Sequence, residues 1–352
     1  MAFQPGGRIR RTPTRRTLGT VEYDDIDRQV VHALQIDGRA PFSRIARVLG
    51  VSDQTVARRY TRLRTAGLVH VVGLWRVGAR GDTGWVVRLR CVPGAAEELG
   101  RMLARRPDTI WVHALSGGTE VNFGARIPAE APDGRHAPTL LEQLPRTRQV
   151  TGVTVLSTLH TFFGGPMSLV NKSGALSAAQ AAALRDRPAP TARCGDGPVP
   201  ADEGDLRLVA TLAEDGRAPL ADLAAATGWS QSTVRRRLGE LRADGSVYLD
   251  VEYDRRMFGL RAHMLMLLAV PPSRLEETGR ALAGHPEVAY AVATTGPTNL
   301  FVSLLCSDSA AVYRYLTTRV AALKGVERVE TLPLVRTFKG ITPHGGGPAT
   351  RA

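Results

Sequence analysis

The chain has 352 residues, of which 43% are hydrophobic, and it carries a formal net charge of +13 at pH 7. This length allows roughly two to four compact domains, and the apolar content is that of an ordinary globular protein. The apolar runs are too short to cross a bilayer and the basic start has no apolar stretch, so we expect a cytoplasmic protein without a membrane partner. The positive charge favours a polyanionic partner, with nucleic acid ahead of a membrane surface.

Residues 1–21 contain several arginines and no acidic residue. We expect them to form a disordered basic arm. Such an arm either follows a nucleic-acid backbone or only solubilises the chain.

The pentapeptide DGRAP occurs at residues 37–41 and again at residues 215–219. A shift of 178 positions aligns residues 27–67 with residues 205–245, and 18 of these 41 positions are identical. The shift is far longer than the period of a solenoid repeat. The sequence therefore predicts a tandem duplication of a unit of one or two domains.

Residues 22–78 are predicted to form a winged helix-turn-helix domain, and residues 202–256 its second copy. In the first copy, one helix ends at Gly38, a short second helix spans residues 41–50, and a third helix follows the N-cap Ser52. A β-branched run at residues 68–77 is expected to supply the strands of a wing. Two helices joined by a tight turn that contains Gly are typical of the helix-turn-helix.

The third helix of each copy is predicted to be the recognition helix that enters the major groove of double-stranded DNA. Val56, Tyr60 and Leu63 share one apolar face, so the arginines fall on the opposite face, where they suit guanine and phosphate. The alternative is an ordinary solvated arginine face. The predicted DNA-binding residues are Ser52, Gln54, Thr55, Arg58, Arg59 and Arg62 in the first copy and Ser230, Ser232, Thr233, Arg235, Arg236 and Arg237 in the second.

The two copies differ in charge. Residues 27–67 hold eight Arg and three Asp, a balance of +5, whereas residues 205–245 hold six Arg and six acidic residues, a balance of zero. Because phosphate contacts supply most of the salt-dependent affinity for DNA, we expect the first copy to bind DNA more strongly.

Each helix-turn-helix is followed by strands and helices in the order βαββαβ, at residues 83–164 and 260–340, which is the ferredoxin-like plan. A Pro/Gly-rich linker is predicted at residues 165–201, beginning as a short helix, and a disordered tail at residues 341–352. The expected fold class is therefore α+β, with two copies of a winged helix-turn-helix domain followed by a ferredoxin-like domain.

This order of motifs, with DGRAP and LGVSDQTVARR, resembles the Lrp/AsnC (feast/famine) family of bacterial transcription regulators. The resemblance implies sequence-specific DNA binding, a small amino-acid-like effector, and pairing of the βαββαβ sheets, here as a pseudo-dimer within one chain. It also implies assembly of such chains into homo-oligomers.

In the family, the effector contacts a Gly-containing turn between the second and third strands of the βαββαβ domain. The matching residues are Gly117, Gly118, Glu120, Gly296, Thr298 and Asn299. Glu120 and Asn299 stand where the family usually has Asp. The alternative is that these glycines only serve tight hairpins.

We expect no enzyme, and hence no catalytic residues, metal or cofactor. The eight histidines and the cysteines Cys91, Cys194 and Cys306 show no catalytic or metal-ligand spacing. A rival interpretation is a siroheme decarboxylase, because those enzymes resemble the same architecture and bind a tetrapyrrole between subunits using His and Arg. Its candidate residues here are His113 and Arg261. A third class is an amino-acid sensor or assembly scaffold that does not bind DNA.

Overall fold

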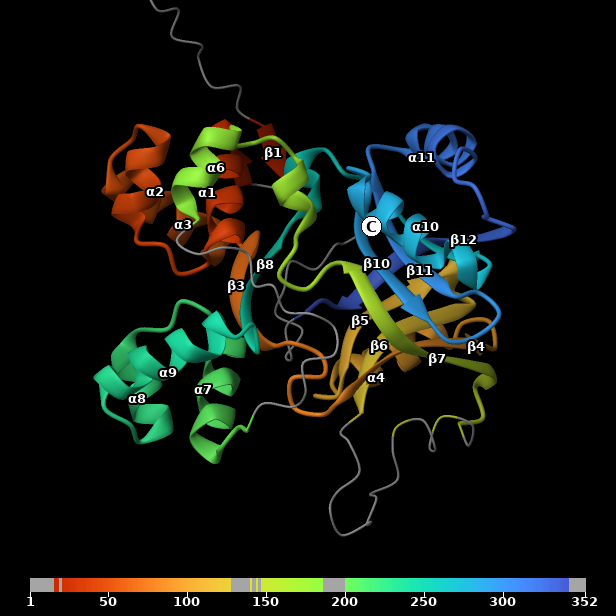
Figure 1. Cartoon of the computed structure of the whole chain (residues 1–352), viewed down its shortest axis with the longest axis horizontal. Coiled ribbons are helices and arrows are strands. Elements are labelled where there is room, and N and C mark those ends of the chain that lie inside the picture. Colours follow the sequence, from red (N-terminus) through yellow and green to blue (C-terminus); the bar gives the residue numbers. More distant parts are fainter. Residues whose placement is uncertain are drawn as a thin grey trace, which may run out of the picture.

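The computed structural model describes residues 16–18, 21–127, 140, 144, 147–185 and 200–341. Most of the predicted arm, the loop at residues 128–139, the second part of the linker and nearly all of the tail lie outside these residues. Two helical lobes lie on one side of the molecule and a β-barrel on the other, with a two-stranded ribbon between the lobes (Figure 1). The predicted α+β class is confirmed. Among the described helices, none is both long and apolar enough to span a bilayer.

The first lobe holds the first helix-turn-helix. Its elements are β1 (Arg16–Leu18), β2 (Val21–Tyr23), α1 (Asp25–Ile36), α2 (Phe42–Leu49) and α3 (Asp53–Thr65). Asp24 and Asp27 form a reciprocal capping box at the start of α1, and Gly50 ends α2 in the left-handed conformation. Strand β1 lies within the segment that we predicted as a disordered arm, and it pairs with β2 in a small antiparallel hairpin.

Part of the predicted linker packs on this first lobe. After η3 (Leu169–Lys172), helix α6 (Ala178–Leu184) buries Leu184 in the core of the lobe, together with Leu176. The N–H of Leu176 donates to Nδ1 of buried His32 at 3.1 Å. The linker therefore adds a fourth helix to the first helix-turn-helix.

The second lobe repeats the three-helix plan of the first. Its helices are α7 (Glu203–Glu214), α8 (Leu220–Thr227) and α9 (Gln231–Ala243). Asp202 and Asp205 form the same capping box, and Gly228 ends α8 as Gly50 ends α2. The duplication inferred from the sequence is therefore also a duplication of local structure.

The predicted wing is wrong in its pairing. The β-branched run forms a single strand, β3 (Val69–Trp75), which pairs antiparallel with β8 (Val247–Tyr253) of the other copy. Val72 lies opposite Asp250, its own counterpart under the shift of 178 positions. A lone strand needs a partner for its backbone groups, and here the second copy supplies it. The pseudo-twofold axis that relates the lobes passes through this pair.

The two DGRAP segments meet across this axis. The guanidinium of Arg39 donates to the carbonyls of Gly216 and Ala218, both at 2.9 Å, and Arg217 donates to the carbonyls of Gly38 and Ala40. Two ion pairs repeat the exchange, Arg64 with Asp215 and Arg242 with Asp37. The pentapeptide thus occurs twice because each copy binds the other.

The ferredoxin-like domains join into one closed barrel of eight strands, in the order β10-β11-β9-β12-β5-β6-β4-β7. The first contributes β4 (Thr83–Cys91), α4 (Ala96–Ala104), β5 (Thr109–Leu115), η1 (Ser116–Gly118), β6 (Glu120–Ile127) and β7 (Val150–Phe163). The second, after η4 (Arg255–Phe258), contributes β9 (Ala262–Ala269), α10 (Pro272–Gly284), β10 (Val288–Thr294), β11 (Leu300–Cys306), α11 (Ser309–Tyr315), the π-helical turn η5 (Leu316–Val320) and β12 (Arg328–Lys339). The pseudo-dimer within one chain that we expected is therefore present.

The barrel closes at two junctions between the halves. In the β5–β12 junction and the β7–β10 junction, the last strand of one half pairs with the second strand of the other. Each last strand also sends a ring over a helix of the other half: a Cβ added at Gly100 of α4 would lie 2.2 Å from the ring of Phe338, and one at Gly279 of α10 would lie 2.2 Å from that of Phe162. Both glycines are needed for this close approach.

Candidate functional site

The first recognition helix, α3, has the faces that the sequence predicts. Val56, Tyr60 and Leu63 are at most 5% exposed, while Gln54 and Arg58 are exposed. The hydroxyl of Ser52 accepts the N–H of Thr55 at 3.1 Å and so caps the helix. Ser52 and Thr55 are thereby engaged in starting the helix, which leaves the side chains further along α3 to meet a partner.

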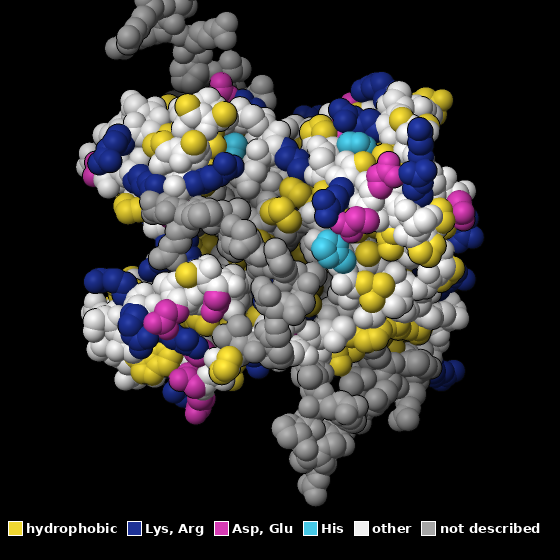
Figure 2. Space-filling model, in the orientation of Figure 1, with side chains coloured by type: hydrophobic (Ala, Val, Ile, Leu, Met, Phe, Trp, Pro, Cys, Tyr) yellow, Lys and Arg dark blue, Asp and Glu magenta, His cyan; other side chains and the backbone are white. Residues whose placement is uncertain are grey.

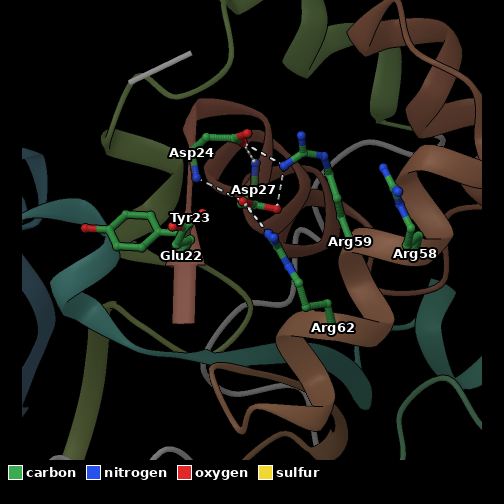
Figure 3. A pocket seen from close by; sticks show the side chains of 7 residues that line it. All are labelled: Glu22, Tyr23, Asp24, Asp27, Arg58, Arg59 and Arg62. Carbon is green, nitrogen blue, oxygen red and sulfur yellow. Dashed lines mark hydrogen bonds and ion pairs between the residues drawn. The ribbon is translucent and has the colours of Figure 1, made fainter. Parts of the chain in front are cut away.

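Two of the predicted DNA-binding arginines are held by carboxylates of the first lobe (Figure 3). Nη1 of Arg59 lies 2.8 Å from Oδ1 of Asp24 and 2.9 Å from Oδ1 of Asp27. Nη2 of Arg62 lies 2.7 Å from Oδ2 of Asp27, whose residue is fully buried. Burial works to lower the pKa of Arg59, yet its hydrogen bonds to Asp27 and Asp24 raise it above its ordinary value. Arg59 therefore fastens α3 to α1.

A pocket of about 230 Å³ opens between α3 and the start of α1. Its lining residues are Glu22, Tyr23, Asp24, Asp27, Arg58, Arg59 and Arg62. Arg62 keeps 45% of its side chain exposed despite its ion pair, and Arg58 has no ion-pair partner among the described residues. Arg58 and Arg62 are therefore the arginines of this pocket that remain accessible to an anion.

The second recognition helix, α9, is more completely neutralised. Arg237 forms a bidentate pair with Asp205, with both N–O distances at 2.7 Å, which corresponds to the Arg59–Asp27 pair of the first lobe. Glu240 occupies the position of Arg62 and pairs with both Arg236 and Arg237. Among the predicted residues, Ser230 caps the helix through Thr233 and also bonds to Ser232, and Arg235 is exposed.

The surfaces of the two lobes show the same difference in charge as the two recognition helices. On the face seen in Figure 2, acidic side chains lie among the basic ones over the second lobe, whereas most of the charged side chains visible on the first lobe are basic. On this face, the charge difference between the two sequences is therefore also visible on the surfaces of the two lobes.

At the first predicted effector turn, the polar side chain already has partners. Gly117 and Gly118 have φ values of 72° and 85°, which accounts for both glycines by backbone conformation. The carboxylate of Glu120 accepts two hydrogen bonds from Arg88, at 2.7 and 2.9 Å. Arg88 also contacts Glu330 of the other half at 2.8 Å.

The second turn is similarly engaged. The side-chain amide of Asn299 accepts the N–H of Val270 at 3.0 Å and donates to the carbonyl of Val270 at 2.7 Å. Thr298 is 5% exposed, and a Cβ at Gly296 would lie 2.6 Å from Leu156 of the other half. The predicted effector residues therefore have structural partners here, and effector contact at these turns stays a prediction.

A pair of histidines lies at the β5–β12 junction. His113 of β5 and His263 of β9 have ring centroids 5.6 Å apart, and His113 is 4% exposed. Nδ1 of His113 lies 3.2 Å from Oγ1 of Thr337, and Nε2 of His263 lies 2.8 Å from Oγ of Ser303. Burial and the nearby Arg255 lower the pKa of His113 to about 3, and burial also lowers that of His263. Both rings are neutral at pH 7.

Arg255 of η4 completes this group, with Nη1 at 3.1 Å from Nδ1 of His263. Arg261, which we selected from the sequence beside His113, is exposed, and its backbone N–H donates to the carbonyl of Cys306. Sequence reasoning thus found His113 but missed His263 and Arg255. Extending the alignment of the copies past residue 67 would have marked Arg255 as a charged residue that only the second copy has. Its counterpart in the first copy is Val77.

The chain combines two helix-turn-helix domains with a shared ferredoxin-like barrel. Residues 24–64 and 202–242 match the AsnC-type helix-turn-helix domain, and residues 264–343 match the Lrp/AsnC ligand binding domain. The chain therefore holds two copies of an AsnC-type helix-turn-helix domain and an Lrp/AsnC ligand binding domain, in a tandem-duplicated arrangement. It is similar to the HTH-type transcriptional regulator FL11 of Pyrococcus horikoshii, with 28% identity over 145 residues that cover 41% of this chain and 95% of that protein.

A second similarity extends over both halves. The siroheme decarboxylase NirDL subunit of Paracoccus denitrificans is 25% identical over 276 residues, covering 75% of this chain and 78% of that protein. The crystal structure of a siroheme decarboxylase NirDL with an iron-uroporphyrin III analogue matches 90% of this chain and 92% of that one, with a TM-score of 0.57 and 16% identity, which shows a shared fold. Our expectation that the chain is not an enzyme is therefore wrong, because relatives of the same full-length architecture are enzymes.

Proposed function

We propose that the chain is a sequence-specific DNA-binding regulator of transcription that contacts the duplex mainly through the first helix-turn-helix. The observation that carries this proposal is the exposed face of α3, where Gln54, Arg58 and part of Arg62 are accessible. Gln suits adenine and Arg suits guanine or phosphate in the major groove. The Asp24–Arg59–Asp27 cluster holds the helix in a fixed orientation, which recognition of a sequence requires.

The two lobes are fixed to one another by the DGRAP contacts and the β3–β8 ribbon. A protein of this kind presents its recognition helices at a set spacing, and the spacing of half-sites on DNA has to match it. A small effector that binds one arrangement better than another would shift DNA affinity through this frame. Further assembly of whole chains into homo-oligomers is part of the proposal.

The test is the selection of DNA fragments by the full chain at low salt, followed by retardation of the selected duplex in gels. We expect a specific fragment to be retained over competitor DNA, and the double variant Gln54→Ala with Arg58→Ala to lose that preference. Failure to retard any duplex at low ionic strength would contradict the regulator proposal.

A second function is favoured by the histidine pair, which lies between the halves of a chain that matches NirDL over both. We propose as the alternative a decarboxylase that acts on a tetrapyrrole carrying carboxylate side chains. Each lost carboxyl group leaves as CO2 when its bond to carbon breaks, and that carbon takes up a proton. His113 and His263 are of the type that moves protons, and a bound carboxylate beside them would raise their pKa values toward neutrality.

The two functions separate in one experiment on the purified full chain. It is incubated with iron-uroporphyrin and with siroheme, and the products are examined for loss of carboxyl groups by mass. Decarboxylated product that disappears in the double variant His113→Ala with His263→Ala supports the enzyme. Unchanged substrate together with specific DNA retention supports the regulator alone.

A further inference from the structure

The two recognition helices are held in matching positions by matching contacts. Both span 13 residues, and each begins at a serine whose hydroxyl accepts the N–H of a threonine three residues further on. Each helix is also tied to the first helix of its lobe by an arginine that pairs with a buried aspartate. These pairs are Arg59 with Asp27 and Arg237 with Asp205. The backbone of α9 is therefore fastened in the second lobe as that of α3 is fastened in the first.

The last turn of each recognition helix contacts the opposite lobe. Nη2 of Arg64 in α3 lies 2.8 Å from a carboxylate oxygen of Asp215, and Nη2 of Arg242 in α9 lies 2.9 Å from one of Asp37. Together with the reciprocal bonds of the DGRAP loops, these ion pairs fix the two helices about the pseudo-twofold axis. In helix-turn-helix dimers, the half-sites on DNA mirror the twofold symmetry of the protein. The backbone of this chain therefore suits two half-sites placed as in a palindrome.

The side chains of the two helices divide into two sets under the shift of 178 positions. From Ser52 to Leu63, six positions cap the helix, pack into the lobe or hold the paired arginine, and five of them carry the same residue in both copies. Of the six positions that face outward, only that of Arg58 and Arg236 carries the same residue. The outward pairs that differ are Asp53 and Gln231, Gln54 and Ser232, Ala57 and Arg235, Thr61 and Gly239, and Arg62 and Glu240. The copies agree where the helix is held and differ where it would meet DNA.

The outward face of α3 offers an amide and a guanidinium. Gln54 and Arg58 are both exposed, and they lie one helical turn apart on the same face. Gln suits adenine and Arg suits guanine, each through paired hydrogen bonds in the major groove. Arg62 adds a partly exposed cation one turn further along, which suits a phosphate. This helix is therefore expected to read an adenine and a guanine in its half-site.

The outward face of α9 offers a different set of groups. Ser232 stands where α3 has Gln54, so the long amide is missing. Arg236 is engaged by Glu240, with Nη1 2.5 Å from Oε1. Arg235, which stands where α3 has an alanine, is exposed and forms no ion pair with the described residues. Successive residues of a helix project about 100° apart, so the free guanidinium of α9 leaves its helix in a different direction from that of α3.

We propose that the DNA target of this chain is a pair of half-sites that are placed as in a palindrome but differ in sequence. Gln54 and Arg58 read the first half-site, and Arg235 reads the second. The inference rests on the proposed regulator function and deepens it, because it defines the form of the DNA site. Since the half-sites differ, the chain binds the duplex in one orientation. A dimer of two identical subunits has no such preference.

The test begins with selection of duplexes from a random pool by the full chain at low salt, followed by sequencing of the retained fragments. We expect two recognition elements at a fixed spacing, neither of which is the reverse complement of the other. Two further duplexes then carry an inverted repeat of the first element or of the second, at the same spacing. Each should bind at least about fivefold more weakly than the selected duplex in gels, as expected when one helix meets the wrong bases.

A variant with five substitutions in α9 copies the outward face of α3. The substitutions are Gln231→Asp, Ser232→Gln, Arg235→Ala, Gly239→Thr and Glu240→Arg. All five positions are exposed or half-exposed, and a Cβ added at Gly239 meets open space. Asp205 is in place to pair with an arginine at position 240, as Asp27 pairs with Arg62. The variant should prefer the inverted repeat of the first element to the selected duplex by at least about fivefold, and thermal unfolding checks that it is folded.

The control variant is Arg280→Gln, which removes an exposed ion pair on α10 and should keep the wild-type preference. A selected site whose two elements are reverse complements, or a site with a single element, overturns the inference and leaves the regulator function standing. Equal binding of the selected duplex and both inverted repeats, or an unchanged preference in the folded α9 variant, also overturns it. Retention of no duplex at all overturns the inference and the regulator function together.

Discussion

The two halves of the chain make the same contacts at several of the places where they meet, and they differ at the recognition helices, at one barrel junction and at the midpoint of the ribbon. The DGRAP loops, the β3–β8 ribbon and the Gly–Phe contacts of the barrel are present in both copies. The recognition helices differ at Arg62 and Glu240, and one barrel junction carries histidines where the other is apolar. In the DGRAP contacts each copy both donates to and accepts from the other, so a change in one copy also removes a partner of the other. Other surfaces are free to diverge.

The largest effect is expected at the DGRAP loops. Arg39→Ala and Arg217→Ala should each lower the free energy of unfolding by about 3 kcal/mol, because charged donors are lost and carbonyls are left without partners. Urea denaturation measures this, and the two losses should agree within about 1 kcal/mol if the loops are equivalent. Arg207→Ala, at an exposed pair with Glu203, is the control and should change stability by about 0.5 kcal/mol or less. Unequal losses would show that the axis is not symmetric in energy.

Next in size are the glycines under the aromatic rings. Gly100→Ala and Gly279→Ala should each cost about 2 kcal/mol, since the added methyl group overlaps the rings of Phe338 and Phe162. Gly239→Ala, in helix α9 with open space around it, should instead stabilise the protein by about 0.5–1 kcal/mol. Thermal unfolding compares the three variants. A neutral result at either Gly100 or Gly279 would mean that its junction can relax.

The histidine junction should make stability depend on pH. The pKa of His113 is about 3 in the folded chain and 6.5 when unfolded, so the unfolded state binds more protons between these values. Stability is therefore full above pH 6.5 and falls as the pH drops toward 3, by up to about 1.4 kcal/mol per pH unit for one histidine. His113→Val copies Val292, the residue of the other junction, and should make this fall shallower. Denaturation at pH 6.5 and pH 4.5 measures it, and an unchanged slope would contradict the assignment. Buried His32, with a pKa of about 4, and His263, whose pKa is also lowered by burial, keep a residual slope in both proteins.

The smallest effects concern DNA. Arg58→Ala should weaken binding of a selected duplex by about 1 kcal/mol and reduce its salt slope by about one, whereas Arg236→Ala, already paired with Glu240, should do less. Glu240→Arg places the residue of the first copy in the second helix and should strengthen binding. Retardation assays at several salt concentrations provide the comparison. Equal losses from Arg58→Ala and Arg236→Ala would remove the distinction between the helices.

Local patterns predict much of this fold, and contacts between distant segments account for what they miss. Apolar spacing and caps located the helices around Val56 and Ser52, and element order predicted the ferredoxin-like domains. The wing was wrong because β3 finds its partner in the other copy of the repeat. The outward face of α3 was correct, but the acids that hold Arg59 come from α1. His263 and Arg255 join His113 only through the barrel, so no local spacing in the chain indicated them.

The ribbon between the lobes has a further consequence at its midpoint. Asp250 lies there opposite Val72, and its Oδ1 accepts a hydrogen bond from the amide of Gln35 at 2.9 Å. Burial raises the pKa of this carboxyl group. Two identical subunits would have to bring two such acids face to face, where like charges repel at close range. A fused polypeptide can keep a single acid at this position and pair it with one amide. Two identical subunits cannot adopt this arrangement, because symmetry would place the same residue on both sides of the axis.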